Sequence, residues 1–389
     1  MKHLNFKRAA LAMSVALLPG FGHADVAADI QHPLWYKAPS AKTMEMAKLD
    51  NLEGVVVSDG QDGAKGFPAA DLKLTDEQIA KVKAGNFTVA ISMGWMGDDW
   101  ASQQLIGLKE TFASMGIKVV AETNANWDDA KQISDLDAIG VLKPSLLVSI
   151  PLNGQTTASA YQKIAAAGTK VVFIDQAVDG MTAGKDYSSI ISSDNLELGM
   201  YLADELADAL HGKGNVAAMY YANDFYVTNL RYEGFIARVL AKYPGMHVVV
   251  AAGHNNPNKG QEVADGLLAR YPTLDGVYAS WSIPAMGAVT SATVAGRTPD
   301  NFKIVNENFD QIVALNMAQN GFISGISSQR PYDQGVAEAK TGALTLIGEP
   351  TPPYIVVPPL KVERSNLAAS YKTIYRVDLP AEMVTALAN

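Results

Sequence analysis

The chain has 389 residues, 48% hydrophobic and 18% charged, so it is long enough for two medium-sized globular domains. Its formal net charge is −9 without a basic cluster, which argues against a nucleic-acid or anionic-lipid partner. The sequence contains no cysteine, so disulfides play no part, and a diacylglyceryl lipid anchor, which needs a cysteine, is not expected.

The first 24 residues have the pattern of a secretory signal peptide. Three basic residues precede an apolar run at 9–18, and a small-x-small pattern ends at Ala24, where we expect cleavage. The apolar run is about half the length that a bilayer-spanning helix needs. Cleavage leaves 28 basic against 40 acidic residues, a net charge of −12. We therefore expect an exported, periplasmic protein whose ligand is neutral or cationic.

Residues 25–85 lack a regular alternation of strands and helices, and we expect them to form an N-terminal extension packed on the first lobe. Their clearest element is a capping box at Thr75 and Gln78, which predicts a short helix ending at Gly85. From residue 86 onward a strand–loop–helix pattern repeats roughly nine times.

The repeats fall into two sets separated by a long amphipathic helix after Asp194. The first set predicts strands at 87–93, 117–122, 145–150 and 170–174, with helices near 100–115, 127–141 and 156–167. The second predicts strands at 215–220, 246–251, 275–279, 302–305 and 322–327, with helices near 227–242, 258–270, 284–295 and 310–319. Such alternation gives parallel sheets with right-handed crossovers, so we expect an α/β fold of two doubly wound parallel-sheet lobes.

Common catalytic and metal-binding patterns are missing from the sequence. The glycines at 212–214 precede a predicted strand instead of following one, so they do not form a dinucleotide fingerprint. Lys185 is followed by Asp186, which does not fit a P-loop, and the histidines are too scattered for a zinc site. We therefore expect a binding protein without cofactor, metal or catalytic residues.

Polar and aromatic residues follow most of the predicted strands. Ligands of doubly wound sheets bind beyond the carboxyl ends of the strands, so we expect these residues to meet in one site. In chain order the candidate ligand-binding residues are Trp95, Asp99, Trp100, Asp175, Gln176, Tyr226, Arg231, Asn255, Trp281, Asn308 and Gln329. Carboxylates, amides and arginine bridge hydroxyl groups while aromatic faces cover C–H surface, which suits a neutral polyhydroxylated ligand.

Several of these residues have a purely structural alternative. Asp98 or Asp99 can cap the helix that follows, and Asp175 can stabilise a local turn. Arg231 lies in a predicted helix and can be a solvated surface residue. Trp127 is interpreted as a packing residue. The clustering of so many candidates at one edge of the sheets favours the ligand site.

Several segments at or near strand ends share their sequence with a known family. They are Ile174-Asp175-Gln176, Ile191-Ser-Ser-Asp-Asn195, Arg231-Tyr-Glu-Gly-Phe235, the run from Tyr278 to Ala288, and Ser327-Ser-Gln-Arg-Pro331 with Gly335. Over roughly residues 87–360 the chain resembles the ribose-type periplasmic sugar-binding proteins, the type I solute-binding components of ABC importers. The resemblance implies that Asp175 chelates two sugar hydroxyls and that Arg231 reaches a hydroxyl or ring oxygen. It also implies ligand contacts for Gln176 and Gln329.

Departures from the family pattern bear on the ligand. Trp281-Ser282 replaces the usual Asn-Asp, Asn308 lies near the usual aspartate of a Gly-Phe-Asp segment, and tryptophans with two acids occupy the first loop. The resemblance therefore implies a small carbohydrate or polyol, namely a pentose, hexose or sugar alcohol, and argues against ribose itself.

The family geometry implies how the chain divides. The expected parts are lobe one at 86–192 plus 331–360, lobe two at 195–328, a loosely placed tail at 361–389, and three hinge crossings near 192–195, 328–331 and 360. The ligand closes the lobes and the permease recognises the closed form, so the permease and ATPase subunits of an ABC importer are the expected partners of the monomer.

Other interpretations stay open. One is a binding protein for a non-sugar signal molecule that reports to a chemoreceptor. Another is a secreted glycoside hydrolase that uses Asp98, Asp99 or Asp175 as its acid–base pair. A transcriptional regulator shares the lobes but begins with a DNA-binding helix-turn-helix, and this chain has an export signal there.

Overall fold

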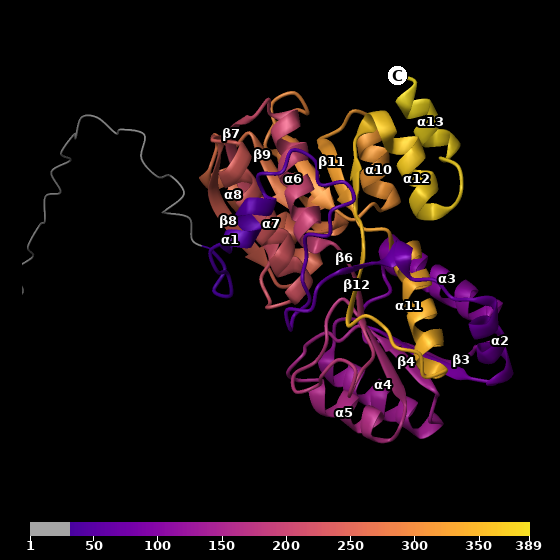
Figure 1. The fold of residues 1–389 in the computed structure, drawn as a ribbon. Helices are drawn as coiled ribbons and strands as arrows, with labels where there is room; N and C mark the ends of the chain where they lie inside the picture. The colour runs from indigo at the N-terminus through magenta and orange to yellow at the C-terminus, as the bar shows by residue number, and fades with distance from the viewer. Residues whose placement is uncertain (1–31) are drawn as a thin grey trace, which may run out of the picture.

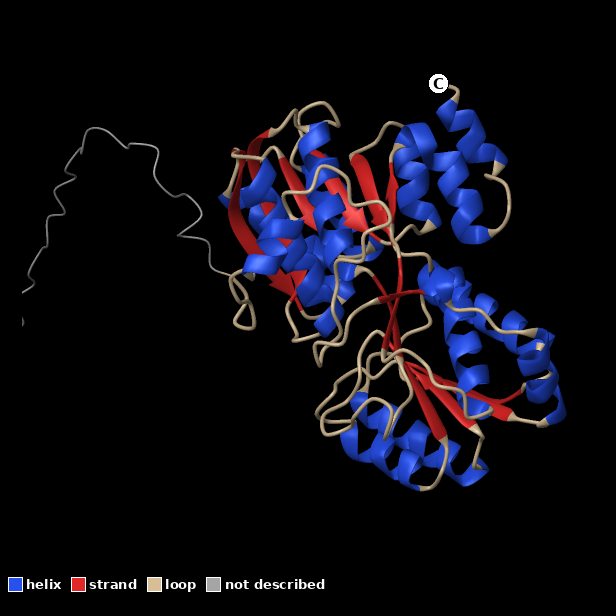
Figure 2. Ribbon diagram, in the orientation of Figure 1, coloured by secondary structure: helices blue, strands red, loops and turns tan. Residues whose placement is uncertain are grey.

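The protein consists of two α/β lobes joined at a narrow waist (Figure 1). The computed structural model describes residues 32–389, so the expected signal peptide at 1–24 lies outside the described residues. Each lobe contains one mostly parallel sheet with helices packed on it (Figure 2), which confirms the predicted fold class. Within residues 32–389, no helix is both long enough and apolar enough to cross a lipid bilayer.

Lobe one is built on a seven-stranded parallel sheet in the order β1-β12-β6-β5-β4-β2-β3. Its strands are β1 (Phe67–Pro68), β2 (Thr88–Met93), β3 (Lys118–Asn124), β4 (Leu146–Ser149), β5 (Lys170–Ile174), β6 (Ile190–Ser193) and β12 (Tyr354–Val357). Its helices are η2 (Ala69–Asp71), α2 (Asp76–Ala84), α3 (Asp99–Ser114), α4 (Asp129–Leu142), α5 (Ala158–Ala166) and α11 (Pro331–Leu346). Helices α3 and α11 enclose one hydrophobic core and α4 and α5 another, so the central strands are apolar on both faces.

Lobe two has a six-stranded sheet in the order β13-β11-β10-β9-β7-β8. Its strands are β7 (Lys213–Tyr221), β8 (Gly245–His254), β9 (Gly276–Ala279), β10 (Lys303–Glu307), β11 (Ile323–Ser328) and β13 (Leu360–Val362). Its helices are α6 (Asn195–Ala209), α7 (Tyr226–Lys242), η3 (Pro257–Lys259), α8 (Gly260–Arg270), α9 (Ser282–Val294) and α10 (Gln311–Ala318). Each helix predicted between residues 100 and 319 begins within two residues of its expected start.

The short strand β13 departs from the predicted parallel pairing, because it runs antiparallel to β11. The chain passes between the lobes after β6, after β11 and between β12 and β13. Strand β11 leads out of lobe two, whereas β13 leads into it, so the two neighbours must run in opposite directions. The predicted three hinge crossings are therefore present.

The C-terminal residues belong to lobe two. They form η4 (Arg364–Asn366), α12 (Leu367–Tyr375) and α13 (Ala381–Leu387). Leu367, Tyr371, Ile374 and Met383 are buried in the same core as the residues of α9 and α10. The tail at 361–389, which was only loosely placed from the sequence, thus extends the lobe-two core.

The N-terminal extension divides between the lobes, so the expectation that all of 25–85 packs on lobe one is wrong for residues 32–57. Helix α1 (Ala41–Met46) contacts α7, and the buried Ala47, Leu52 and Val57 pack against α6 and α7. Those two helices leave an apolar face that this segment covers. Further along, β1 pairs with β12 and α2 packs on α11, so this part does lie on lobe one. The capping box of α2 is present as predicted.

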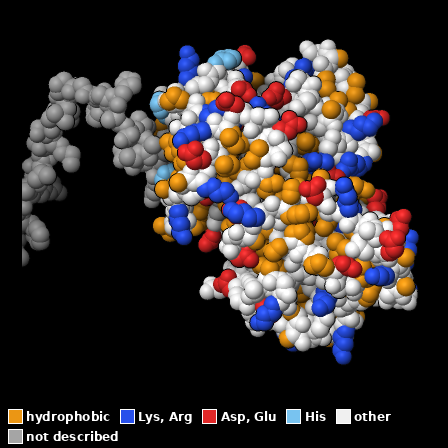
Figure 3. Space-filling model, viewed as in Figure 1, with side chains coloured by type: hydrophobic (Ala, Val, Ile, Leu, Met, Phe, Trp, Pro, Cys, Tyr) orange, Lys and Arg blue, Asp and Glu red, His pale blue; other side chains and the backbone are white. Residues whose placement is uncertain are grey.

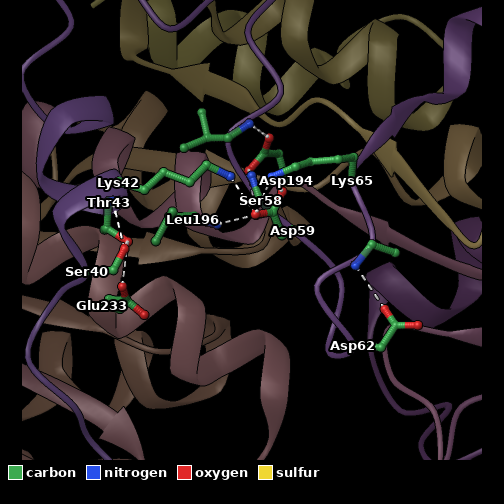
Figure 4. Close-up of polar contacts among 12 residues, drawn as sticks. Ser40, Lys42, Thr43, Ser58, Asp59, Asp62, Lys65, Asp194, Leu196 and Glu233 are labelled. Atoms are coloured by element: carbon green, nitrogen blue, oxygen red, sulfur yellow. Dashed lines mark hydrogen bonds and ion pairs between the residues drawn. The ribbon is translucent and has the colours of Figure 1, made fainter.

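Residues 57–66 join these two parts across the waist, and we name them the hinge strap (Figure 4). The buried Asp194, which lies at the first crossing, accepts hydrogen bonds from Val57 N at 2.6 Å and Ser58 N at 3.0 Å. Ser58 Oγ donates to Asp194 at 2.6 Å and accepts from Leu196 N at 2.9 Å. The strap is therefore fixed to the N-terminus of α6, where the chain changes lobes.

Ser58→Ala is expected to lower the free energy of unfolding by about 1–3 kcal/mol, because it leaves buried polar groups on Asp194 and Leu196 with fewer partners. Urea unfolding followed by circular dichroism measures the change. Ser114→Ala, an exposed serine at the end of α3, is the control. Equal losses for the two variants would contradict the buried role of Ser58.

Candidate functional site

A cavity lies between the lobes at the carboxyl ends of both sheets. Lobe one lines it with Gly94, Trp95, Asp98, Trp100, Trp127, Ile150, Leu152 and Asp175. Lobe two lines it with Phe225, Val227, Arg231, Pro257, Trp281, Ser282, Ile283, Asn308, Asp310 and Gln329. In each sheet the first strand of the alternating pattern, β2 or β7, lies between its second and third strands, and ligands bind at this type of topological switch point.

Four non-glycine residues of this cavity have left-handed backbone conformations. The φ angles are 62° at Trp127, 64° at Asp175, 66° at Trp281 and 75° at Asn308. Each residue follows a strand, and the conformation costs about 1–3 kcal/mol for a residue with a side chain. Trp281 has ψ 166°, a combination otherwise used by glycine. Such strain concentrates at binding sites, so these positions support a functional cavity.

Tryptophan side chains form much of the cavity wall. Trp127 of lobe one lies 6.0 Å from Trp95 and 5.6 Å from Trp281 of lobe two, measured between ring centroids. Tyr221 lies 4.8 Å from Trp281. Trp127 thus packs against the hydrophobic core, as interpreted from the sequence, and it also lines the cavity. The helix that follows begins at Asp129, two residues later than predicted, which leaves Trp127 in a loop at the cavity.

A chain of buried hydrogen bonds connects the two lobes beneath the cavity. Ser192 Oγ donates to Asp175 Oδ1 at 2.8 Å and accepts from Asn195 Nδ2 at 2.8 Å. Asn195 Oδ1 accepts from Arg231 Nε at 2.8 Å. Ser192 and Asn195 flank the first hinge crossing. The expected carboxylate and arginine are thus joined to each other through the hinge.

Arg231 is buried, with 1% of its side chain exposed, so the alternative of a solvated surface residue is wrong. Its guanidinium forms an ion pair with the buried Glu307, which also accepts a hydrogen bond from Tyr278 Oη at 2.7 Å. Gly199 and Gly234 let α6 and α7 approach closely, because a Cβ at Gly199 would lie 2.0 Å from the Arg231 carbonyl oxygen. Close helix packing therefore fixes the position of Arg231.

Burial controls the titration of the cavity carboxyl groups. It raises the pKa of Asp175, against the opposing effects of Arg231 and the Ser192 hydroxyl. Burial and the nearby carboxyl group of Asp98 raise the pKa of Asp310 to about 7. Asp98 has its own pKa raised by burial. Burial also lowers the pKa of His254 to about 4, so this imidazole is neutral at pH 7.

Seven of the predicted site residues lie together at the cavity, and four do not. Asp99 Oδ2 accepts from Gln311 N at 2.8 Å and lies 2.8 Å from Tyr375 Oη, so it joins the lobes outside the cavity. Asn255 is exposed. Neither residue is expected to contact ligand, because neither belongs to the cavity lining.

Gln176 and Tyr226 also lie outside the cavity lining. Gln176 Oε1 accepts from Tyr226 N at 3.3 Å across the lobes, and Gln176 Nε2 donates to Pro151 O at 2.9 Å. Tyr226 Oη donates to Asp59 O of the hinge strap at 2.7 Å. Their polar groups thus hold the lobes and the strap together.

Sequence reasoning missed several lining residues. Asp98 does cap α3, since its Oδ1 accepts from Ala101 N at 2.9 Å, and it also lines the cavity. The capping and binding interpretations are therefore compatible. Asp310 was not a candidate, although it follows Asn308 by two residues, a signal that could have identified it. The apolar lining residues Ile150, Leu152, Phe225, Val227 and Pro257 carry no distinctive sequence signal.

Two α/β lobes around a cavity, connected by three hinge crossings, define a hinged solute-binding protein. The chain belongs to the periplasmic binding protein domain family, whose sequence model matches residues 89–350. It is 26% identical over 263 residues to the D-ribose/D-allose-binding protein of Pseudomonas aeruginosa, covering 67% of this chain and 75% of that protein. The predicted family resemblance is therefore confirmed.

Further relatives agree with this assignment. The ribose import binding protein of Bacillus subtilis is 25% identical over 211 residues, which cover 54% of this chain and 67% of that protein. The fold is similar to a solved ABC transporter solute-binding protein from Agrobacterium vitis, bound with α-D-tagatopyranose, with a TM-score of 0.68 and 23% identity. That match covers 76% of this chain and 100% of the other.

Asp310→Asn is expected to flatten the dependence of stability on pH. The folded protein holds the Asp310 proton up to about pH 7, whereas the unfolded chain releases it near pH 3.8. The free energy of unfolding of the wild type therefore falls between these values, by at most about 1.4 kcal/mol per pH unit from this group. Urea unfolding at pH 5 and pH 8 measures the effect.

The stability of Asp310→Asn relative to wild type should be higher at pH 8 than at pH 5. The charged neighbours that face Asp310 are Asp98 and Asp99. Asp300→Asn, an exposed aspartate of the same lobe, should show no such difference. An equal effect of Asp310→Asn at both pH values would contradict the raised pKa.

Tyr375→Phe is expected to favour opening of the lobes. The Tyr375 hydroxyl lies 2.8 Å from Asp99 Oδ2 of lobe one and 2.7 Å from Phe309 O of lobe two. Removal of this hydroxyl lowers the free energy that holds the lobes together by about 0.5–1.5 kcal/mol. Small-angle X-ray scattering should show a larger radius of gyration than for wild type or for Tyr271→Phe, which changes a half-buried tyrosine at the end of α8. An unchanged radius would show that this contact does not hold the lobes closed.

Proposed function

We propose that the protein is the solute-binding component of an ABC importer and that it binds a small carbohydrate or polyol between its lobes. The observation that carries the proposal is the hydrogen-bond chain from Asp175 through Ser192 and Asn195 to Arg231. This chain places the Asp175 carboxylate of lobe one, an acceptor, and the Arg231 guanidinium of lobe two, a donor, at one cavity with aromatic walls. Hydroxyl groups both donate and accept, so a polyhydroxylated ligand matches both sides.

The same arrangement supports a mechanism of ligand-induced closure. Trp127 and Trp281 come from different lobes and approach to 5.6 Å, so a ligand between the lobes contacts both only in the closed form. A ligand shifts an equilibrium between open and closed forms by its difference in affinity for the two. The permease would recognise this closed, ligand-bound form, and the ATPase subunits of the importer would act together with the permease.

Export and partners form part of the proposal. The signal-like pattern at 1–24 supports secretion to the periplasm, and two relatives bear names of import binding proteins. We propose that the protein acts there as a monomer and binds its ligand without turnover. Reporting to a chemoreceptor would use the same closed form. Three relatives that match over half of this chain bear names of binding proteins, which supports binding over hydrolysis.

A thermal-shift screen of the purified protein against monosaccharides and polyols tests the function. A ligand at about 1,000 times its dissociation constant should add about 4 kcal/mol to folded-state stability, a shift of several degrees. Four of the five tryptophans line the cavity, so a true ligand should also change the intrinsic fluorescence. Protein that was unfolded, dialysed and refolded excludes a carried-over ligand. A silent panel with refolded protein would reject the carbohydrate assignment.

Asp175→Ala is expected to weaken binding of a responding ligand by about 1.5–3 kcal/mol, because it removes a buried acceptor. Isothermal titration measures the change. Asp179→Ala, an exposed aspartate of the same lobe, should bind as the wild type does. Wild-type affinity in Asp175→Ala would reject this site assignment while leaving the family unchanged.

A further inference from the structure

The cavity between the lobes has an excess of acidic side chains. Asp98, Asp175 and Asp310 line it, and among the residues that the structure describes Arg231 is the one lysine or arginine of its lining. On the outer face shown in Figure 3, by contrast, acidic and basic side chains are interspersed. The cavity is therefore more acidic than that surface. The question is which group balances the negative charge of its aspartates.

Arg231 does not balance these carboxylates. Its guanidinium forms an ion pair with Glu307, and both side chains are buried, with 1% and 0% exposed. Glu307 is held in place by the Tyr278 hydroxyl, so the pair is fixed and neutral overall. His254, packed 5.8 Å from Trp281, is neutral at pH 7 because burial lowers its pKa to about 4. Arg231 still opposes the raised pKa of Asp175, so Asp98 and Asp310 are the two lining carboxyl groups that face a ligand without a cation of the described lining beside them.

Asp98 and Asp310 approach the cavity from opposite lobes. Asp98 precedes α3 in lobe one, and Asp310 precedes α10 in lobe two. Asp310 is 9% exposed, and its Oδ1 is buried with no partner among the described residues. The nearby carboxyl group of Asp98 makes Asp310 harder to ionise. A group that donates hydrogen bonds and carries positive charge would satisfy both.

The aromatic walls suit the same kind of group. Trp95, Trp127 and Trp281 line the cavity, and with Tyr221, which packs on two of them, they form a continuous cluster with neighbouring centroids 4.8–6.1 Å apart. The faces of tryptophan and tyrosine rings attract a cation within about 6 Å of the centroid, an effect that increases when water is excluded. Aromatic faces also cover the C–H surface of neutral sugars, so the walls alone do not decide the charge. The charge of the ligand is instead indicated by Asp98 and Asp310, the lining aspartates that have no cation of the described lining beside them.

We propose that the ligand is a small hydroxylated molecule that carries one positively charged nitrogen, with this nitrogen between Asp98 and Asp310 and against the tryptophan wall. This inference rests on the proposed function, a small polyhydroxylated solute, and specifies its class as an amino sugar, an amino polyol or a hydroxylated quaternary amine. Asp175 and the Arg231–Glu307 pair then bind the hydroxyl groups. The competing explanation is a neutral sugar with one proton shared between Asp98 and Asp310.

Matched pairs of probes separate these explanations. We would titrate refolded protein at pH 6.5 with D-glucosamine, D-glucose and N-acetyl-D-glucosamine, following tryptophan fluorescence and thermal stability. The acetylated sugar keeps the nitrogen but not its charge. Choline and its uncharged isostere 3,3-dimethyl-1-butanol form a second pair. The charged member of at least one pair should bind ten times or more tighter than its neutral counterpart.

Substitutions test whether the preference for the charged probe depends on Asp98 and Asp310. Asp98→Asn and Asp310→Asn should each reduce the preference for the charged probe at least tenfold, and asparagine at 98 can still cap α3. Asp128→Asn is the matched control, because Asp128 caps α4 in the same way but does not line the cavity. The control should keep the full preference.

The outcomes distinguish this inference from the proposed function. Tighter or equal binding of the neutral sugar overturns the charged ligand and leaves the carbohydrate-binding function intact. A preference for the charged probe that survives both asparagine substitutions overturns the placement between Asp98 and Asp310. Silence of all probes and of the wider sugar and polyol panel rejects the proposed function, and the inference with it.

Discussion

The buried hydrogen-bond chain from Asp175 to Arg231 is the interaction on which the rest of the structure depends. It passes through Ser192 and Asn195, the two residues that flank the first crossing between the lobes. The groups that present hydrogen bonds to the cavity are therefore part of the hinge itself. Any rotation about that crossing changes the distance between the acceptor of one lobe and the donor of the other. In the proposed function, contact with a ligand and movement of the lobes are therefore directly linked through these residues.

Glu307 gives this chain its electrostatic character. A buried arginine without a partner would be strongly destabilising, and the pair with Glu307 removes that penalty while holding the guanidinium rigidly. The same pair removes the positive charge that would otherwise offset the cavity aspartates. The acidity of the cavity is thus a consequence of how lobe two stabilises its own core, since Glu307 ends β10 and Tyr278 lies in the neighbouring β9.

The fold could be predicted from the sequence because strands and helices alternate with clear hydrophobic periods from Thr88 onward. The site was accessible in part: Asp175, Arg231 and Trp281 follow or face strand ends, where doubly wound sheets bind ligands. The place of Trp127 at the cavity was not predicted, because a two-residue error in the helix start assigned a loop residue to the helix. Gln176 and Tyr226 were misassigned because their partners include the hinge strap and the opposite lobe, and contacts of that kind leave no local pattern.

The hinge strap gives this protein a feature that three crossings alone would not provide. Its beginning is held on lobe two beside Asp194, and its end continues into β1 at the edge of the lobe-one sheet. Separation of the lobes must therefore stretch ten residues or break the bonds to Asp194. The strap acts as a mechanical stop that narrows the range of open conformations. A narrower open ensemble loses less conformational entropy when the lobes close, so part of the ordering that ligand capture requires is already present in the empty protein.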